Sequence, residues 1–164
     1  MMRAPKETTA TPESVRALVW RIVRDAQVLK DKHIADQIDA QVNYTCIFAK
    51  DEAEYNVLLQ AISALGPKVD SSKRGLIFDV GGIDTSAGQL RVLKLRAPDP
   101  ERPERGDADF TVSNYPGFKA TYLSRPGFKL LLRPKFEMIE LMDPAFDVLA
   151  YFSHPPLDEQ LGLR

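Results

Sequence analysis

The sequence predicts an α+β fold, in which two β-α-β-β-β modules form one curved mixed sheet behind an N-terminal helical arm. Two observations predict it. An order of strand-like and helix-like segments occurs twice along the chain. A linker rich in proline, arginine and acidic residues, at about 97–106, separates the two halves. The chain has 164 residues, enough for a single globular domain, so we divide it into an arm (1–40) and a paired-module region (41–164).

The arm is expected to be an amphipathic helix. Thr11 is a good N-cap, Pro12 suits the first turn, and Glu13 meets the positive end of the helix dipole. Apolar residues then recur at helical spacing across 15–26. The simpler interpretation is a helix packed on its own domain. The alternative is a homodimer contact with Trp20 as its anchor.

Each module should begin with a strand and a helix. In the first module these are 42–48 and 51–65, and in the second they are 107–112 and 115–123. Glycine and proline at 66–67 end the first helix. Three further strand-like runs complete each module, at 68–70, 76–80 and 90–96 in the first, and 128–133, 136–142 and 146–152 in the second.

Alternation along the strands predicts which side chains face a common site. The more apolar set of the first strand is Tyr44, Cys46 and Phe48, which we expect to lie under its module's helix. Polar residues would then share the opposite, open face of the curved sheet. Polar groups that converge in a concave face are the usual sign of a binding site. The residues assigned to this face are Asn43, Thr45, Lys94, Arg96, Asp107 and Asp109.

Three stretches carry a family resemblance: QVNYTCIFAKDEAEYNVLLQAISALG, RVLKLRAPDPERPERGDADFTV and YFSHPPLDEQL. Together with the order of elements, over about 41–160, they resemble the vicinal oxygen chelate superfamily of glyoxalases and extradiol dioxygenases, and within it the YecM-type proteins. The resemblance implies a cup that holds a metal through His, Glu or Gln side chains. Matched position by position, its four ligand positions fall on Asn43, Lys94 and Asp107, and near Tyr151.

These replacements argue against the usual metal. A catalytic transition metal needs imidazole and carboxylate donors around an open position. Lys94 would place a cation where the metal sits, and would more naturally pair with Asp107. The two histidines, His33 and His154, are interpreted as surface or packing residues rather than ligands, and Cys46 as a small buried hydrophobe.

Composition bounds the function. The formal net charge of −1 gives no reason to expect nucleic acid as a partner. One cysteine fits a reducing cytoplasm, and neither a membrane-spanning run nor a signal peptide is expected. The leading hypothesis is a cytoplasmic protein without a cofactor that binds a small anionic molecule through the positive charges of Lys94 and Arg96.

Two other classes stay open. One is an enzyme, namely an isomerase, lyase or hydrolase, that uses Asp107 as general base or a divalent metal held by Asp107, Asp109 and Glu140. The other is an interaction protein that acts through its N-terminal helix.

Overall fold

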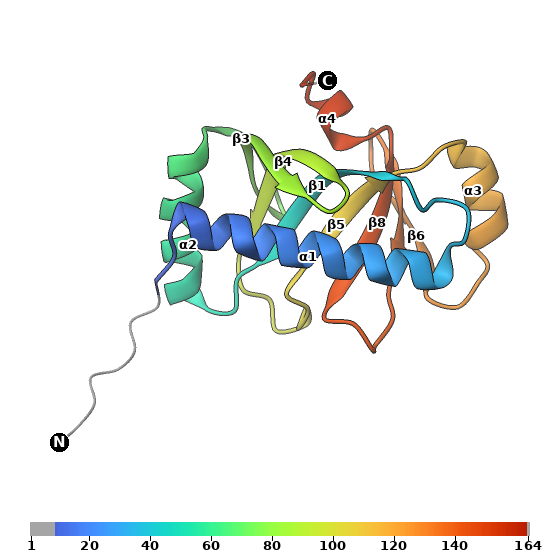
Figure 1. Cartoon of the computed structure of the whole chain (residues 1–164), viewed down its shortest axis with the longest axis horizontal. Coiled ribbons are helices and arrows are strands. Elements are labelled where there is room, and N and C mark those ends of the chain that lie inside the picture. The colour runs from blue at the N-terminus through green and yellow to red at the C-terminus, as the bar shows by residue number, and fades with distance from the viewer. Residues whose placement is uncertain (1–8, 164) are drawn as a thin grey trace.

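The computed structural model describes residues 9–163 and has the α+β architecture expected from the sequence. A long helix and a mixed sheet form two layers (Figure 1). The elements of the arm and the first module are α1 (Pro12–His33), β1 (Gln41–Phe48), α2 (Glu52–Leu65), β2 (Lys68–Ser72), β3 (Gly75–Thr85) and β4 (Gly88–Arg96). The second module and the C-terminal helix are β5 (Gly106–Thr111), α3 (Tyr115–Tyr122), β6 (Phe128–Leu132), β7 (Glu137–Leu141), β8 (Val148–His154) and α4 (Leu157–Gln160).

The two modules repeat one strand arrangement. The sheet order is β2-β3-β4-β1-β5-β8-β7-β6, so the order reads the same outward from β1 and from β5. In each module the first strand pairs in parallel with the last, and the remaining pairs are antiparallel. The modules join where β1 runs antiparallel to β5. The expected repeat of β-α-β-β-β units is therefore present, with the proline-rich linker between β4 and β5.

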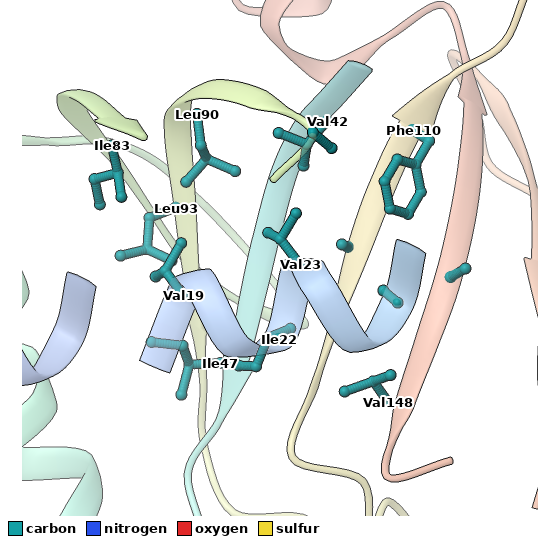
Figure 2. Close-up of a cluster of buried hydrophobic side chains, with 14 of the residues drawn as sticks. Val19, Ile22, Val23, Val42, Ile47, Ile83, Leu90, Leu93, Phe110 and Val148 are labelled. Atoms are coloured by element: carbon teal, nitrogen blue, oxygen red, sulfur yellow. The ribbon is translucent and has the colours of Figure 1, made fainter. Parts of the chain in front are cut away.

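Helix α1 packs on its own chain. It begins as expected, with Thr11 capping the backbone N–H of Ser14. It crosses one face of the sheet, with α2 and α3 at the two ends of that face (Figure 1). Its buried apolar side chains meet those of the central strands (Figure 2), and burial of each contributes about 1.5–3 kcal/mol. Trp20 is 44% exposed, and a homodimer through it stays a prediction.

The start of β5 requires glycine. A Cβ on Gly106 would lie 2.2 Å from the carbonyl oxygen of Cys46 and 2.9 Å from Cδ1 of Ile22. The absence of a side chain therefore lets β1, β5 and α1 approach closely at the junction of the two modules.

Arg105, just before β5, ties α2 to this junction. Its guanidinium donates to the carbonyl oxygen of Phe48 at 2.9 Å and to the two carboxylate oxygens of Glu54 at 2.7 and 3.1 Å. The ion pair is largely buried, so each charge needs the other to offset the free-energy cost of its removal from water.

The assignment of the two faces of β1 was wrong. Tyr44, Cys46 and Phe48 face away from α1, whereas Val42 and Ile47 belong to the core beneath it. Both faces of β1 are buried, so hydrophobicity alone does not distinguish them. A β-bulge between Val42 and Tyr44 also adds a residue and shifts the alternation at this point. Among residues 9–163, no helix is both long and apolar enough to cross a bilayer.

Candidate functional site

A cavity of about 1040 Å³ lies on the face of the sheet opposite α1. We call it the cup cavity. Both outer strands contribute to it, β2 through Asp70 and Ser72 and β6 through Lys129 and Leu131. Because the two ends of the sheet line a single cavity, the sheet must curve around it. The sheet therefore has the expected concave face, and the cavity lies on it.

One row of side chains crosses the centre of the cup. Cys46 on β1 lies opposite Lys94 on β4 and opposite Asp107 on β5, and all three line the cavity. Neighbouring strands are about 4.8 Å apart, so the backbones of Lys94 and Asp107 are separated by roughly 10 Å. In the part of the chain that the structure describes, these two residues form no ion pair. The pairing expected from the sequence is absent, and the Lys94 ammonium instead lies 5.5 Å from the ring centre of Tyr44.

The register also identifies equivalent positions in the two modules. Tyr44 pairs with Val92, two residues before Lys94, and Asp107 pairs with Leu149, two residues before Tyr151. Tyr44 therefore corresponds to Asp107, and Lys94 corresponds to Tyr151. All four of these residues line the cup cavity. The sequence placed Asn43 at the first of these positions, and the bulge shifts that position to Tyr44.

Two predicted site residues lie elsewhere. The Asn43 side chain donates to the Asp158 carboxylate at 2.6 Å and accepts from the Asp158 backbone N–H at 3.2 Å, which fastens α4 to β1. Thr45 donates its hydroxyl to the carbonyl oxygen of Asp107 at 2.5 Å, and its side chain is fully buried. Neither residue lines the cavity, so their roles are structural.

Strand β5 carries two buried carboxyl groups, of which Asp107 lines the cavity and Asp109 does not. Asp107 is only 6% exposed, and one of its carboxylate oxygens has no hydrogen-bond partner within residues 9–163. Burial raises the pKa of Asp107 to about 7, against the opposing charges of Lys94 and Arg96. At neutral pH this carboxyl is therefore protonated in part of the molecules and can either donate or accept a hydrogen bond.

Asp109 lies deeper and does not line the cavity. One of its oxygens accepts from the backbone N–H of Ser153 at 3.1 Å and from the Ser153 hydroxyl. Burial, together with the nearby charge of Asp107, raises the pKa of Asp109 to about 8 against the opposing effect of the bonds from Ser153. Because it does not line the cavity, Asp109 is not placed to contact a ligand directly.

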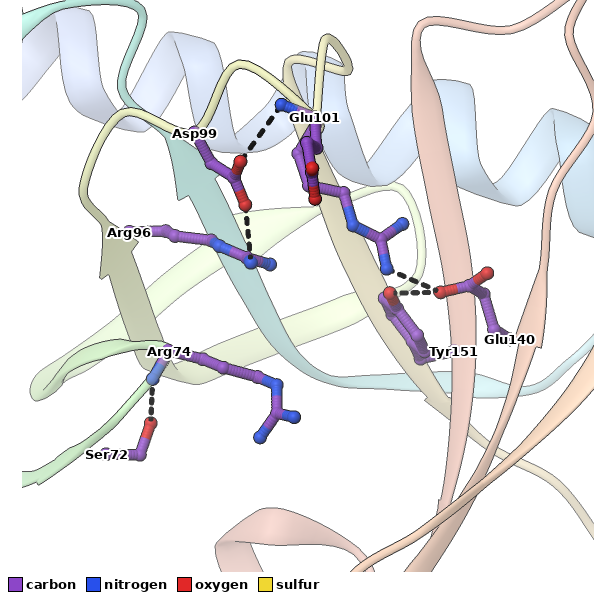
Figure 3. Close-up of polar contacts among 8 residues, drawn as sticks. Ser72, Arg74, Arg96, Asp99, Glu101, Glu140 and Tyr151 are labelled. Carbon is purple, nitrogen blue, oxygen red and sulfur yellow. Dashed lines mark hydrogen bonds and ion pairs between the residues drawn. The ribbon is translucent and has the colours of Figure 1, made fainter.

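Glu140 acts through its neighbours on the cavity wall. The Tyr151 hydroxyl donates to Glu140 at 2.7 Å, and the Arg102 guanidinium lies 3.5 Å from the same oxygen (Figure 3). Burial raises the pKa of Tyr151 far above its ordinary value, so the phenol keeps its proton. Tyr151 faces the cavity as predicted, while Glu140 lies behind it and holds its hydroxyl.

Basic residues at the mouth of the cup were missed in the sequence. Arg74 follows β2, and Arg133 and Lys135 follow β6, so matching hairpins of the two modules place positive charge on one cavity. Arg102, in the linker, is a further basic residue of the lining that was missed. The available signal was the pair of basic turns Lys-Arg and Arg-Pro-Lys at the same place in each repeat. Arg96, which was predicted, also lines the cavity and forms an ion pair with Asp99 at 3.1 Å.

The residues at the four equivalent positions do not fit the superfamily's metal. Two protonated phenols, an ammonium and one carboxyl lack the imidazole and carboxylate set that such an ion requires. Over the described range, no three His, Cys, Asp or Glu side chains form a group that could hold a metal ion. The alternative set of Asp107, Asp109 and Glu140 is therefore not arranged as a metal site.

The histidines contribute to packing outside the cup. His33 lies 2.8 Å from the Asp143 carboxylate, which also binds Lys32 at 2.7 Å. The His154 ring stacks on Tyr115 with ring centres 4.5 Å apart. Neither histidine lines the cavity. Cys46 is buried as expected, and burial raises the pKa of its thiol, which makes it a poor nucleophile.

Comparison with known proteins identifies the fold but not the chemistry. No protein-family model matches the chain, and no curated protein matches it. A solved structure from structural genomics, Protein EC4020, superposes with a TM-score of 0.70 at 12% sequence identity. The match covers 96% of this chain and 98% of that chain. At this identity the likeness shows a shared fold alone.

Proposed function

We propose that this protein binds a small anionic molecule in the cup cavity, on a vicinal-oxygen-chelate-like fold of the YecM type that does without the superfamily's metal. The repeated modules and the position of the cavity support the relationship. The observation that carries the proposal is the Lys94 ammonium, which lines the centre of the cavity and has no ion-pair partner among residues 9–163. An anionic ligand would supply the missing countercharge.

The surroundings of Lys94 favour a ligand over a structural role. A half-buried ammonium costs free energy unless it is paired, because burial removes much of its hydration. Tyr44 provides only a cation–π contact. Asp107 lies on the other side of Cys46 from Lys94. It is close enough to interact electrostatically with Lys94 but forms no direct bond with it. A carboxylate or phosphate group bound between the two strands would contact Lys94 and also accept a hydrogen bond from protonated Asp107.

The test is isothermal titration of the purified protein with malonate, a dicarboxylate, and with glucose as a neutral control. We expect malonate to bind and glucose not to bind. Lys94→Met should weaken malonate binding at least tenfold, the loss of about one charge-assisted contact. The matched control is Arg16→Gln, which removes an exposed charge on α1 far from the cavity. Equal malonate affinity in the Lys94→Met and wild-type proteins would contradict the proposal.

A second candidate is proton-transfer catalysis in the same cavity. Its specific support is Asp107, which has an unpartnered oxygen in the described part of the chain and a pKa raised to about 7, close to the value that suits a general base. Asp107→Asn would abolish such an activity while leaving malonate binding within about threefold, because the amide keeps the shape and a hydrogen-bond donor.

A further inference from the structure

Four arginines from four separate places in the chain line the mouth of the cup cavity. Arg74 comes from the β2–β3 turn, Arg96 from the end of β4, Arg102 from the linker, and Arg133 from the β6–β7 turn. Figure 3 shows the side chain of Arg74, from the β2–β3 turn, and that of Arg96, from the end of β4, extending in the same direction, toward Tyr151. Positive charge from both ends of the curved sheet therefore gathers at the mouth of the cavity.

Only two of these four arginines form an ion pair in the part of the chain that the structure describes. Arg96 is paired with Asp99, and Arg102 lies near Glu140. Arg74 and Arg133 have no ion pair within residues 9–163, and the Arg133 guanidinium donates only to the carbonyl oxygen of Leu132 at 3.0 Å. The nearby carboxylates of Asp70 and Glu101 also line the cavity, but neither forms an ion pair with an arginine in that part of the chain.

The other arginines repel the positive charge of Arg74. Partial burial lowers the pKa of Arg74, and the charges of Arg133, Arg96 and Arg102 lower it further. Like charges held together at a cavity mouth raise the free energy of the empty state, and a bound anion relieves it. Arg74 and Arg133 lie on the hairpins at opposite ends of the sheet, so they approach the mouth from opposite sides.

We propose that this arginine cluster binds a phosphate dianion, so that the anionic ligand of the cup carries a phosphate group. This rests on the proposed anion binding and specifies its ligand class. Three terminal oxygens of a phosphate point in different directions and can accept bidentate bonds from guanidiniums on two sides. A carboxylate presents two oxygens in one plane and satisfies one such fork. Arginine, rather than lysine, is the residue suited to this planar recognition.

The test is isothermal titration with inorganic phosphate, glycerol 3-phosphate and malonate, near physiological salt so that nonspecific attraction is screened. We expect glycerol 3-phosphate to bind at least tenfold more tightly than malonate. Arg74→Gln and Arg133→Gln should each weaken glycerol 3-phosphate binding about tenfold. Arg74→Lys should regain only part of the affinity lost in Arg74→Gln, because an ammonium keeps the charge but lacks the two parallel N–H donors of a guanidinium. The relative affinities of inorganic phosphate and the ester show whether the natural ligand is free or esterified phosphate.

The variants also separate this inference from the proposed function. If Arg74→Gln and Arg133→Gln bind glycerol 3-phosphate as well as Arg16→Gln does, the arginine site is wrong, while loss of malonate binding in Lys94→Met would leave anion binding in place. If wild-type protein binds neither malonate nor either phosphate, both proposals fail. Both arginines lie in surface turns, and an unchanged thermal midpoint would show that the variants fold.

Discussion

Lys94 and Asp107 flank Cys46 in one row across the cup, and they line the same cavity without an ion pair in the part of the chain that the structure describes. The ammonium and the carboxyl group thus face one cavity without direct contact. The relationship makes the ionisation of Asp107 depend on Lys94, and it leaves room for a ligand to contact both.

Stability should fall as the pH rises. The pKa of Asp107 is raised to about 7 and that of Asp109 to about 8, so the folded protein keeps protons that unfolded carboxyls, with a pKa of about 3.9, release. The stability that these groups contribute is complete below about pH 4 and is lost as the pH rises through about 7 to 8. Urea denaturation should show the free energy of unfolding falling by a few kcal/mol over this range.

Replacement of one carboxyl should flatten this profile. Asp107→Asn removes the group that is costly to ionise, so the variant should be more stable than the wild type above about pH 8. Asp143 has the opposite effect on the pH dependence of stability. Bonds from Lys32, the backbone of Ala145 and His33 lower its pKa, so it contributes stability that is lost as the pH falls. An Asp107→Asn profile parallel to that of the wild type would contradict the assignment of the slope to this residue.

Lys94→Met should raise the pKa of Asp107 above about 7, because Lys94 is the largest opposing charge. Carbon-13 NMR titration of the carboxyl would measure this. The sequence predicted a direct pair between Lys94 and Asp107. With no direct pair, we expect the double-mutant cycle with Asp107→Asn to give a coupling of about 1 kcal/mol. Lys129→Met is the control, since Lys129 is also on the cavity wall but does not shift Asp107. Equal pKa values in both lysine variants would refute the coupling.

Arg105→Met should destabilise the fold by about 3 kcal/mol, since it leaves the largely buried Glu54 carboxylate and the Phe48 carbonyl without their partner. Arg16→Gln, which breaks an exposed pair on α1, should change the free energy of unfolding by less than about 0.5 kcal/mol. Guanidinium denaturation of both variants measures the difference. Similar losses in the two would show that the Arg105 pair is no more buried than a surface pair.

Asn43→Ala should loosen α4 without unfolding the protein. The substitution removes both bonds between Asn43 and Asp158, worth about 1 kcal/mol each. Hydrogen exchange should become faster at the backbone amides of 160–163, which bond within the α4 turn, and remain unchanged in β1. Faster exchange throughout the sheet would instead mean that Asn43 supports the core.

Much of the fold could be predicted because it depends on local signals. The cap at Thr11, the apolar spacing of α1 and the proline-rich linker each fix an element through short-range chemistry. The repeat in the order of elements then indicated the paired modules. The faces of β1 could not be assigned in this way, because Cys46 and Phe48 pack with apolar residues of β7 and β8 on the cup side. A strand that is buried on both faces has no alternation of apolar and polar residues to show which face points toward the helices.

Part of the candidate site could also be predicted from a local signal, the alternation of side chains along regular strands. Lys94, Arg96, Asp107 and Tyr151 line the cavity because their strands alternate regularly. Asn43 was misplaced by a bulge, a backbone irregularity without a clear sequence signal here. The basic turns were missed because their convergence depends on the curvature of the whole sheet, which brings residues about 60 positions apart, 74 and 133, to one cavity mouth.

The two basic turns also bear on self-association. Strands β2 and β6 are the free edges of the sheet, and an exposed edge offers unpaired backbone groups to another chain. Exposed positive charge beside each edge repels the same edge of a second copy, so these residues disfavour pairing of edge strands between two molecules. An anion that neutralises Arg74 and Arg133 would weaken this repulsion. If an anion binds in the cup as proposed, its binding would therefore lower the resistance to aggregation through the same side chains.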